Sequence, residues 1–190
     1  AVSGLVMDAM WDLLNRIQRA QPGVEAWMSD LHARNAAQST AASATGFARL
    51  GQYFPASILE GARAVTVDRM PFPPVVALGL PEFEALAAMP MAGITFGHMY
   101  FLHRDHAGEA LHFHELVHVV QWAALGVAAF LPTYAVGIVQ HGYEASPFEL
   151  AAYDLQAKFE RGNALPGIVD FIRWHADETR KEAESLFQSV

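Results

Sequence analysis

The sequence predicts an α+β fold that is mainly helical and contains one small twisted β-sheet. Three features predict it: apolar residues at helical spacing near both ends, β-branched and alternating apolar residues in the middle, and a long apolar helix directly after them. The chain has 190 residues, 53% of them hydrophobic, which is enough to bury the core of one domain. We therefore expect a single domain over residues 1–190, with a helical region (1–60), a small sheet (61–106) and a second helical region (107–190).

The first helical region is expected to hold two helices. Apolar side chains recur at helical spacing over residues 4–20, and a second helix is expected over 24–33, after the Pro22-Gly23 pair. In the sheet region, short β-branched runs at 63–70 and 73–80 are cut by prolines. Residues 94–102 alternate like one strand, in which Gly97 marks either a bulge or a close backbone approach.

The second helical region begins with a helix expected over residues 109–130. The uncharged stretch 119–140 is long enough to cross a membrane. The segment 131–134, Leu-Pro-Thr-Tyr, is expected to break it into two pieces, so we predict a buried helical pair in preference to a membrane span. A further helix is expected to start at Pro147, and an amphipathic helix with highly charged last turns closes the sequence.

Composition disfavours several classes of function. Twelve Lys and Arg against twenty Asp and Glu give a net charge of -8, whereas nucleic-acid binding needs a basic face, so we expect no nucleic-acid partner. The absence of cysteine excludes a disulfide framework, a thiolate metal site and a cysteine nucleophile. The first twenty residues lack the pattern of a signal peptide, so we expect a cytoplasmic protein. Nothing in the sequence indicates an oligomeric state.

The strongest candidates for catalytic and metal-binding residues lie in one pentapeptide, His114-Glu115-Leu116-Val117-His118. It is an HExxH motif, and residues four apart on a helix project from the same face. His114 and His118 can therefore bind one Zn²⁺ ion, a metal that neutral imidazole suits. Glu115 stands beside them and can act as general base toward a water molecule. His112 points to another side of the helix, so we expect a surface or core role for it.

A catalytic zinc site needs a third protein ligand, and three residues compete for the role. We favour Glu149, because the apolar turn that follows it predicts a buried acid that needs a strong partner. Glu149 also fits a capping box with Ser146 as N-cap, which would make it a structural residue at the surface. Glu144 and His141 remain the alternative ligands.

The segments HELVHVVQW and, about thirty residues later, SPFELAAYD resemble the zincin superfamily of metallopeptidases. More narrowly, residues 92–159 are similar to uncharacterised bacterial peptidase-like domains with a GITFGH-type strand, a HELxHVxQ helix and a PxExxAY segment. The resemblance implies a gluzincin-like centre with ligands His114, His118 and Glu149 and with Glu115 as general base. One departure is that Tyr153 stands four residues after Glu149, where the best-known signature has Asp.

The sequence therefore predicts a zincin-like peptidase that uses one Zn²⁺ ion and cleaves peptides or unfolded proteins. The resemblance implies that the edge strand before the metal helix runs along the cleft, where an extended peptide can add to its free backbone groups. Tyr143 and Tyr153 are candidates for stabilising an oxyanion, although either can be a packing aromatic. The alternative function is a non-catalytic, zinc-stabilised interaction module or pseudo-peptidase.

Overall fold

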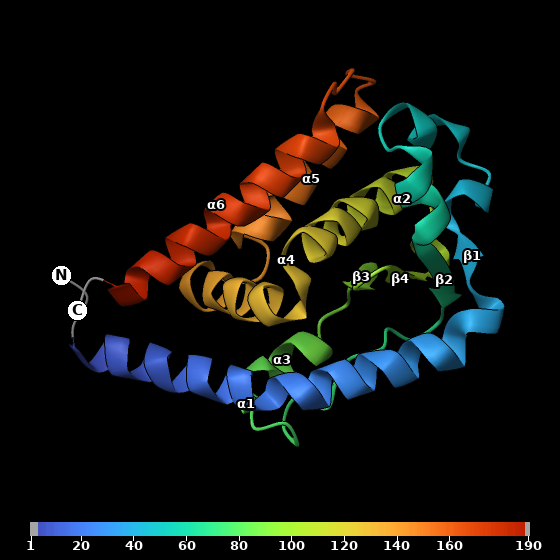
Figure 1. The fold of residues 1–190 in the computed structure, drawn as a ribbon. Coiled ribbons are helices and arrows are strands. Elements are labelled where there is room, and N and C mark those ends of the chain that lie inside the picture. Colours follow the sequence, from blue (N-terminus) through green and yellow to red (C-terminus); the bar gives the residue numbers. More distant parts are fainter. Residues whose placement is uncertain (1–3, 189–190) are drawn as a thin grey trace.

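The structure is a computed structural model that describes residues 4–188. It is 68% helical with a small mixed sheet of four strands, so the predicted mainly helical α+β fold is confirmed (Figure 1). The helices are α1 (Gly4–Asn35), α2 (Ala56–Gly61), α3 (Glu84–Ala87), α4 (Glu109–His141), α5 (Pro147–Glu160) and α6 (Ile168–Gln188). The strands are β1 (Thr40–Ala41), β2 (Arg63–Val67), β3 (Gly93–Phe96) and β4 (Met99–His103).

The sheet has the order β1-β2-β4-β3. Strands β2 and β4 run parallel, and the two outer pairs are antiparallel. Successive side chains of β4 point to opposite faces, and both faces are covered. Tyr100 and Leu102 belong to the same apolar cluster as Leu116 of α4, whereas Phe101 joins Met28 of α1. The sheet is therefore buried between α4 and α1. Strand β3 forms the edge of the sheet that lies beside α4.

The expectation of one strand over residues 94–102 is wrong, because the segment is a hairpin. Gly97 has a φ of 67° and, with His98, forms the two-residue turn between β3 and β4. Glycine adopts this left-handed conformation without steric cost, and two-residue turns of this kind match the twist of the strands that they join. Gly97 thus marks a hairpin turn and not a bulge within one strand. The proline-rich run 73–80 forms turns and no strand, because proline cannot donate to a ladder.

The expected break between two N-terminal helices is absent, since α1 continues through Pro22. The buried face of α1 recurs every three or four residues on both sides of the proline, which keeps one apolar stripe intact. Its buried members are Leu13, Ile17, Ala20, Val24, Met28 and Leu31. Gly23 sits so close to Leu78 that a Cβ there would lie 2.6 Å from the leucine side chain. Burial of this continuous stripe outweighs the helix-breaking tendency of Pro22.

Helix α4 bends at Gly126, whereas the sequence analysis placed the break at residues 131–134. Gly126 has a φ of 69° and a ψ of 168°, which only glycine adopts readily, and the second half of the helix includes Pro132. Among the described helices, α4 is long and apolar enough to cross a membrane, and 33% of its most apolar window is buried. Residues 112–122 of α4 are buried, and the helix contacts α1, α5, α6, β3 and β4.

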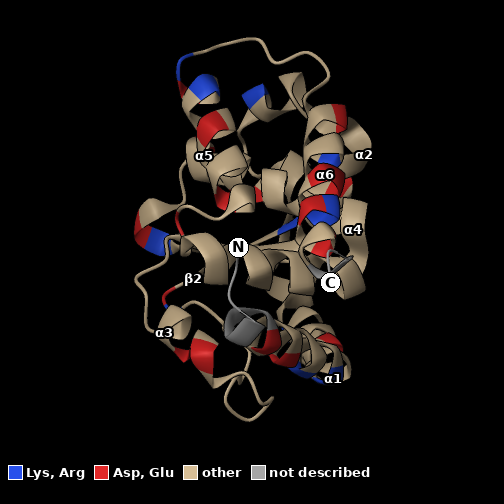
Figure 2. Cartoon of the chain, turned by 90° about the vertical axis from the view of Figure 1, so that its left-hand side faces the viewer, with Lys and Arg blue, Asp and Glu red and all other residues tan. Residues whose placement is uncertain are grey.

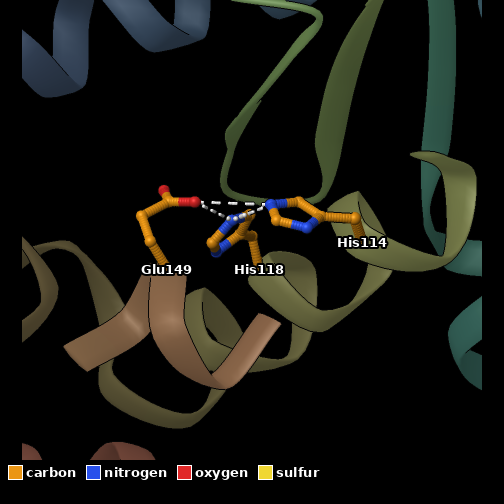
Figure 3. Close-up of side chains that lie close together, drawn as sticks. All are labelled: His114, His118 and Glu149. Carbon is orange, nitrogen blue, oxygen red and sulfur yellow. Dashed lines mark hydrogen bonds and ion pairs between the residues drawn. The ribbon is translucent and has the colours of Figure 1, made fainter. Parts of the chain in front are cut away.

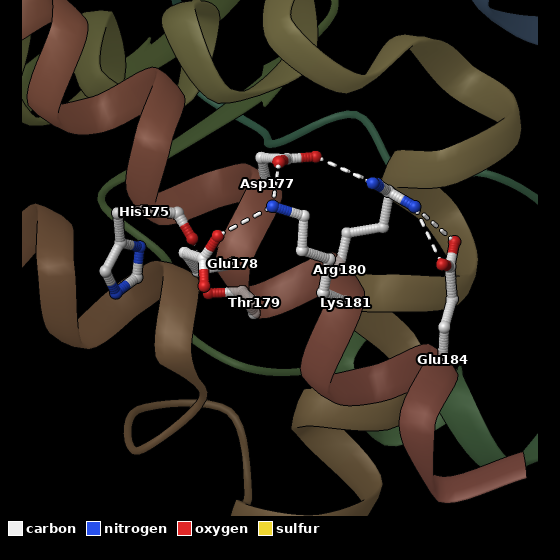
Figure 4. Close-up of polar contacts among 7 residues, drawn as sticks. All are labelled: His175, Asp177, Glu178, Thr179, Arg180, Lys181 and Glu184. Atoms are coloured by element: carbon white, nitrogen blue, oxygen red, sulfur yellow. Dashed lines mark hydrogen bonds and ion pairs between the residues drawn. The ribbon is translucent and has the colours of Figure 1, made fainter. Parts of the chain in front are cut away.

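Charged residues gather on the outer surfaces of the terminal helices. On α6, Arg180 bonds Asp177 and Glu184, and Lys181 bonds Asp177 and Glu178, all at helical spacings of three or four residues (Figure 4). Exposed pairs of this type contribute little to stability, because solvent screens them. Basic and acidic residues are interspersed in the view of Figure 2. The charged end predicted for the last helix is therefore a solvated face.

Candidate metal centre

Three side chains from α4 and α5 converge at one point in the interior (Figure 3). His114 Nε2 lies 3.1 Å from His118 Nε2, and Glu149 Oε2 lies 3.3 and 3.4 Å from these two nitrogens. The residues are only 5%, 7% and 2% exposed, in that order. The helical spacing of four aligns the two imidazoles, and Glu149, in the first turn of α5, faces them. The structure thus brings together the three residues that the sequence analysis favoured as metal ligands.

The two carboxylate oxygens of Glu149 differ in their surroundings, because only one of them accepts a hydrogen bond. Its Oε1 accepts a hydrogen bond of 2.6 Å from the Tyr134 hydroxyl. Its Oε2 is buried and has no hydrogen-bond partner among the described residues. A buried carboxylate oxygen without a donor is costly, and a cation between Glu149, His114 and His118 would satisfy it. This triad could therefore hold a metal ion.

Two glutamine side chains orient the imidazoles. His114 Nδ1 donates to Gln156 Oε1 at 3.0 Å, and His118 Nδ1 donates to Gln121 Oε1 at 2.8 Å. The Gln121 amide also donates to the Phe148 carbonyl at 3.3 Å, which fixes its orientation. With the proton on each Nδ1, each Nε2 carries the lone pair that a metal ion needs. The hydrogen bonds from Gln156 and Gln121 thus direct both imidazole Nε2 atoms toward Glu149 Oε2, the point at which a metal ion would bind.

The charges of the triad are strongly coupled. Although burial by itself raises the pKa of Glu149, the imidazoles of His118 and His114 hold it well below its usual range. Burial opposes protonation of His118, yet the carboxylates of Glu149 and Glu115 raise its pKa to about 9. The two carboxylates therefore favour a positive charge at His118. A metal ion and a proton compete for this imidazole, which makes metal affinity pH-dependent.

Glu115 lies beside the triad and outside it. The Thr95 hydroxyl of β3 donates to Glu115 Oε2 at 2.7 Å, and a Cβ on Gly93 would collide with Glu115 Oε1. Burial raises the pKa of Glu115 above its ordinary value. A buried carboxylate with a raised pKa is suited to taking up and returning a proton. The edge strand therefore positions the residue predicted as general base.

The alternative third ligands lie outside the triad. His141 and Glu144 are exposed. The capping box is also absent, because the Ser146 side chain makes no capping hydrogen bond in the described structure and Glu149 is buried. Asp154 is exposed and pairs with Lys158 at 2.6 Å, so it gives the centre no support. Glu149 is the one acidic candidate of the loop and helix start that reaches the two histidines.

Three residues that support the triad were not predicted from the sequence. Tyr134 was assigned to a helix break, and Gln121 and Gln156 were given no role at the site. Their signal is positional: Gln121 stands three residues after His118, and Gln156 stands seven residues, or two helical turns, after Glu149. Three-residue spacing would have placed the first amide beside its imidazole.

The two tyrosines proposed for oxyanion stabilisation differ in their surroundings. Tyr143 is partly buried and lines a cavity beside the triad, where burial and the Glu149 carboxylate raise its pKa. Tyr153 is exposed, and its ring centroid lies 4.7 Å from that of His114. Both hydroxyls stay protonated at neutral pH, as a hydrogen-bond donor to an oxyanion requires.

Comparisons with known proteins add no relative to this picture. No protein-family model, curated protein or solved structure matches the chain. The assignment of the centre therefore rests on its own geometry: a buried triad of two imidazoles and a carboxylate that could bind a metal ion.

Proposed function

We propose that the chain is a zinc-dependent metallopeptidase that hydrolyses peptide bonds. One observation carries the proposal: Glu115 is buried beside His114, His118 and Glu149, so that a candidate general base adjoins a candidate three-ligand metal site. A purely structural zinc site commonly has four protein ligands, whereas a catalytic one has three and an open position. The described residues supply three.

The donor set and its spacing favour zinc. Two neutral imidazoles and one carboxylate form a ligand set that is typical of catalytic zinc sites. With bonds of about 2.0–2.1 Å and tetrahedral angles, the ligand atoms of a zinc ion lie about 3.4 Å apart. The three ligand atoms here are separated by 3.1, 3.3 and 3.4 Å. The triad therefore fits one zinc ion with little movement.

The chain's own residues divide the work of hydrolysis. Bound zinc supplies Lewis-acid chemistry, which polarises a carbonyl and makes water more acidic. Glu115 takes the proton of the attacking water and returns it to the leaving amine. Tyr143 donates a hydrogen bond to the developing oxyanion. The backbone of β3, which has one partner strand among those described, holds an extended peptide through main-chain hydrogen bonds.

Turnover is the test that separates this proposal from a zinc-stabilised interaction module. The zinc-loaded protein is incubated with an unfolded protein and with a library of extended peptides, and new amino termini are counted. We expect cleavage that a chelator abolishes and added zinc restores. Stoichiometric zinc whose removal unfolds the protein, with no cleavage of either substrate, would instead support the interaction module.

A further inference from the structure

An apolar cavity adjoins the metal centre. It has a volume of about 140 Å³, and Glu115, His118 and Glu149 lie on its wall together with Tyr134 and Tyr143. These are the titratable side chains of the cavity wall within the described part of the chain, and all belong to the metal centre or its surroundings. The cavity therefore has one polar end, where the chemistry is proposed to occur.

The rest of the wall is apolar and comes from four parts of the chain. Helix α1 contributes Ile17 and Val24, seven residues apart, which span about 10 Å along the helix axis. Phe83 comes from the segment before β3, Ile94 from β3 itself, and Ala135 from the second half of α4. Packed hydrophobic side chains from these segments thus form the rest of the cavity wall.

The lining decides which group can enter. A charged side chain would lose its hydration there without finding an opposite charge outside the centre, which is strongly unfavourable. An apolar group, by contrast, is stabilised when it leaves water for an apolar wall. In size, apolar cavities of about 150 Å³ accept a benzene-sized molecule. The cavity is therefore suited to one bulky, uncharged side chain such as that of phenylalanine or leucine.

The edge strand connects this cavity to the path proposed for the substrate. All four residues of β3, Gly93 to Phe96, contribute to the cavity wall. A peptide that adds to the edge of β3 alternates its side chains, so every second one points to the same face. One such side chain can enter the cavity while the adjoining peptide bond lies at the triad.

We propose that the ligand of this centre carries a bulky, uncharged apolar group, which the cavity receives next to the scissile bond. As a statement about cleavage specificity, this inference rests on the proposed peptidase function. The recognition of the apolar group itself depends on the cavity alone.

Binding is tested first, without metal or turnover. Toluene is titrated into the metal-free protein and into Ala135→Phe, whose added ring occupies the cavity. The matched control is Ala124→Phe on the same helix, where the alanine is exposed. We expect wild type and control to bind toluene alike and Ala135→Phe to bind at least about tenfold more weakly. Equal binding by all three proteins, or no binding by any, would overturn the inference.

A second variant covers the case in which Ala135→Phe fails to fold. Ile138 also lines the cavity and is only partly buried, so Ile138→Ala enlarges the space at moderate cost. We expect Ile138→Ala to raise the affinity for naphthalene relative to toluene. An unchanged ratio would contradict the assignment of this cavity as the binding site.

Cleavage specificity is tested with peptides that differ at one position beside the scissile bond. We expect kcat/KM to be at least about tenfold higher with Phe or Leu than with Ala, Lys or Glu at that position. Equal rates would overturn the inference and leave the peptidase function standing. If no peptide is cleaved but Ala135→Phe still abolishes toluene binding, the ligand class is supported and the peptidase function fails.

Discussion

Two faces of the same stretch of α4 carry buried histidines with opposite properties. His112 lies on one face, where its Nδ1 is 2.9 Å from the Tyr100 hydroxyl and its ring packs against Phe47. Burial lowers its pKa to about 4. On the other face, His114 and His118 direct their Nε2 atoms at Oε2 of Glu149.

The difference shows that burial alone does not make a histidine a ligand. The hydrogen-bond partner of His112 is a neutral hydroxyl and not a carboxylate, so we assign His112 to the core. The triad instead leaves a carboxylate oxygen without a donor, while its imidazoles are oriented from behind by amides. What distinguishes the candidate metal site is the convergence of atoms that make no other hydrogen bond.

The strongest way to sharpen this comparison is to remove the proposed general base. Glu115→Gln should lower kcat/KM by about 100- to 10,000-fold, because it keeps the shape of the side chain and loses its ability to take a proton. Zinc content should stay at the wild-type value, measured by mass spectrometry of the dialysed protein. Glu109→Gln, the same change on the same helix, serves as control. Wild-type turnover in Glu115→Gln would refute the mechanism.

Removal of the third ligand tests the composition of the triad. Glu149→Ala should leave the dialysed protein with almost no zinc, since two imidazoles remain where three protein ligands are needed. Glu144→Ala, which removes an exposed acid from the preceding loop, should retain one ion per chain. Equal zinc content in the two variants would mean that Glu149 is no ligand.

The orienting amides should matter less than the ligands. Gln121→Leu and Gln156→Leu should each weaken zinc affinity about 10- to 100-fold, as loss of a hydrogen bond behind a metal-bound imidazole commonly does. Competition with a chromogenic chelator measures this affinity. Tyr134→Phe, which frees Oε1 of Glu149, is expected to act in the same direction.

The face of α4 that carries His112 is tested through its hydrogen-bond partner. Tyr100→Phe should lower the free energy of unfolding by about 1–3 kcal/mol, because it leaves Nδ1 of the buried His112 without a partner. Urea titration of the folded protein measures the loss. Zinc affinity should not change. A variant that loses zinc while keeping its stability would show that the two faces are not independent.

The smallest effect is a difference in pH dependence. An unfolded histidine has a pKa of about 6.5, so between pH 6.5 and about 4 the unfolded chain binds a proton that the folded His112 does not. The free energy of unfolding is therefore highest, as far as His112 is concerned, above pH 6.5, and it falls as the pH drops from 6.5 toward 4. For metal-free protein, lowering the pH from 7.5 to 5.5 should cost wild type about 1 kcal/mol more than His112→Phe. An identical loss in both would contradict the lowered pKa.

The sequence predicted the members of the triad better than their surroundings. HExxH spacing places His114 and His118 on one face whatever the fold, and the apolar turn after Glu149 indicates burial. Tyr134 could not be predicted, because its position depends on where α4 bends. Either Gly126 or the Leu-Pro-Thr-Tyr segment could interrupt the helix. In the folded chain the interruption is at Gly126.

The fold shows the same division between local and tertiary effects. The helix start at Pro147 was predicted correctly, because local residues determine it. The uninterrupted α1 was not, since burial of its stripe against the rest of the chain outweighs Pro22. For the hairpin a local signal existed: glycine in the first position of a two-residue loop, as in Gly97-His98, is typical of a tight hairpin turn.

The bend at Gly126 has a consequence for how the centre assembles. On a straight helix, Tyr134 would stand sixteen residues from His118, about 24 Å along the axis. The bend lets Tyr134 reach Glu149, and the described side chains bonded to the triad, Gln121, Tyr134 and Gln156, all lie within residues 114–156. Such short sequence separations carry a low entropy of loop closure, which favours rapid formation. The triad and its hydrogen-bond partners thus come from one stretch of the chain, whereas α1, from the far end of the sequence, covers the sheet and part of the cavity.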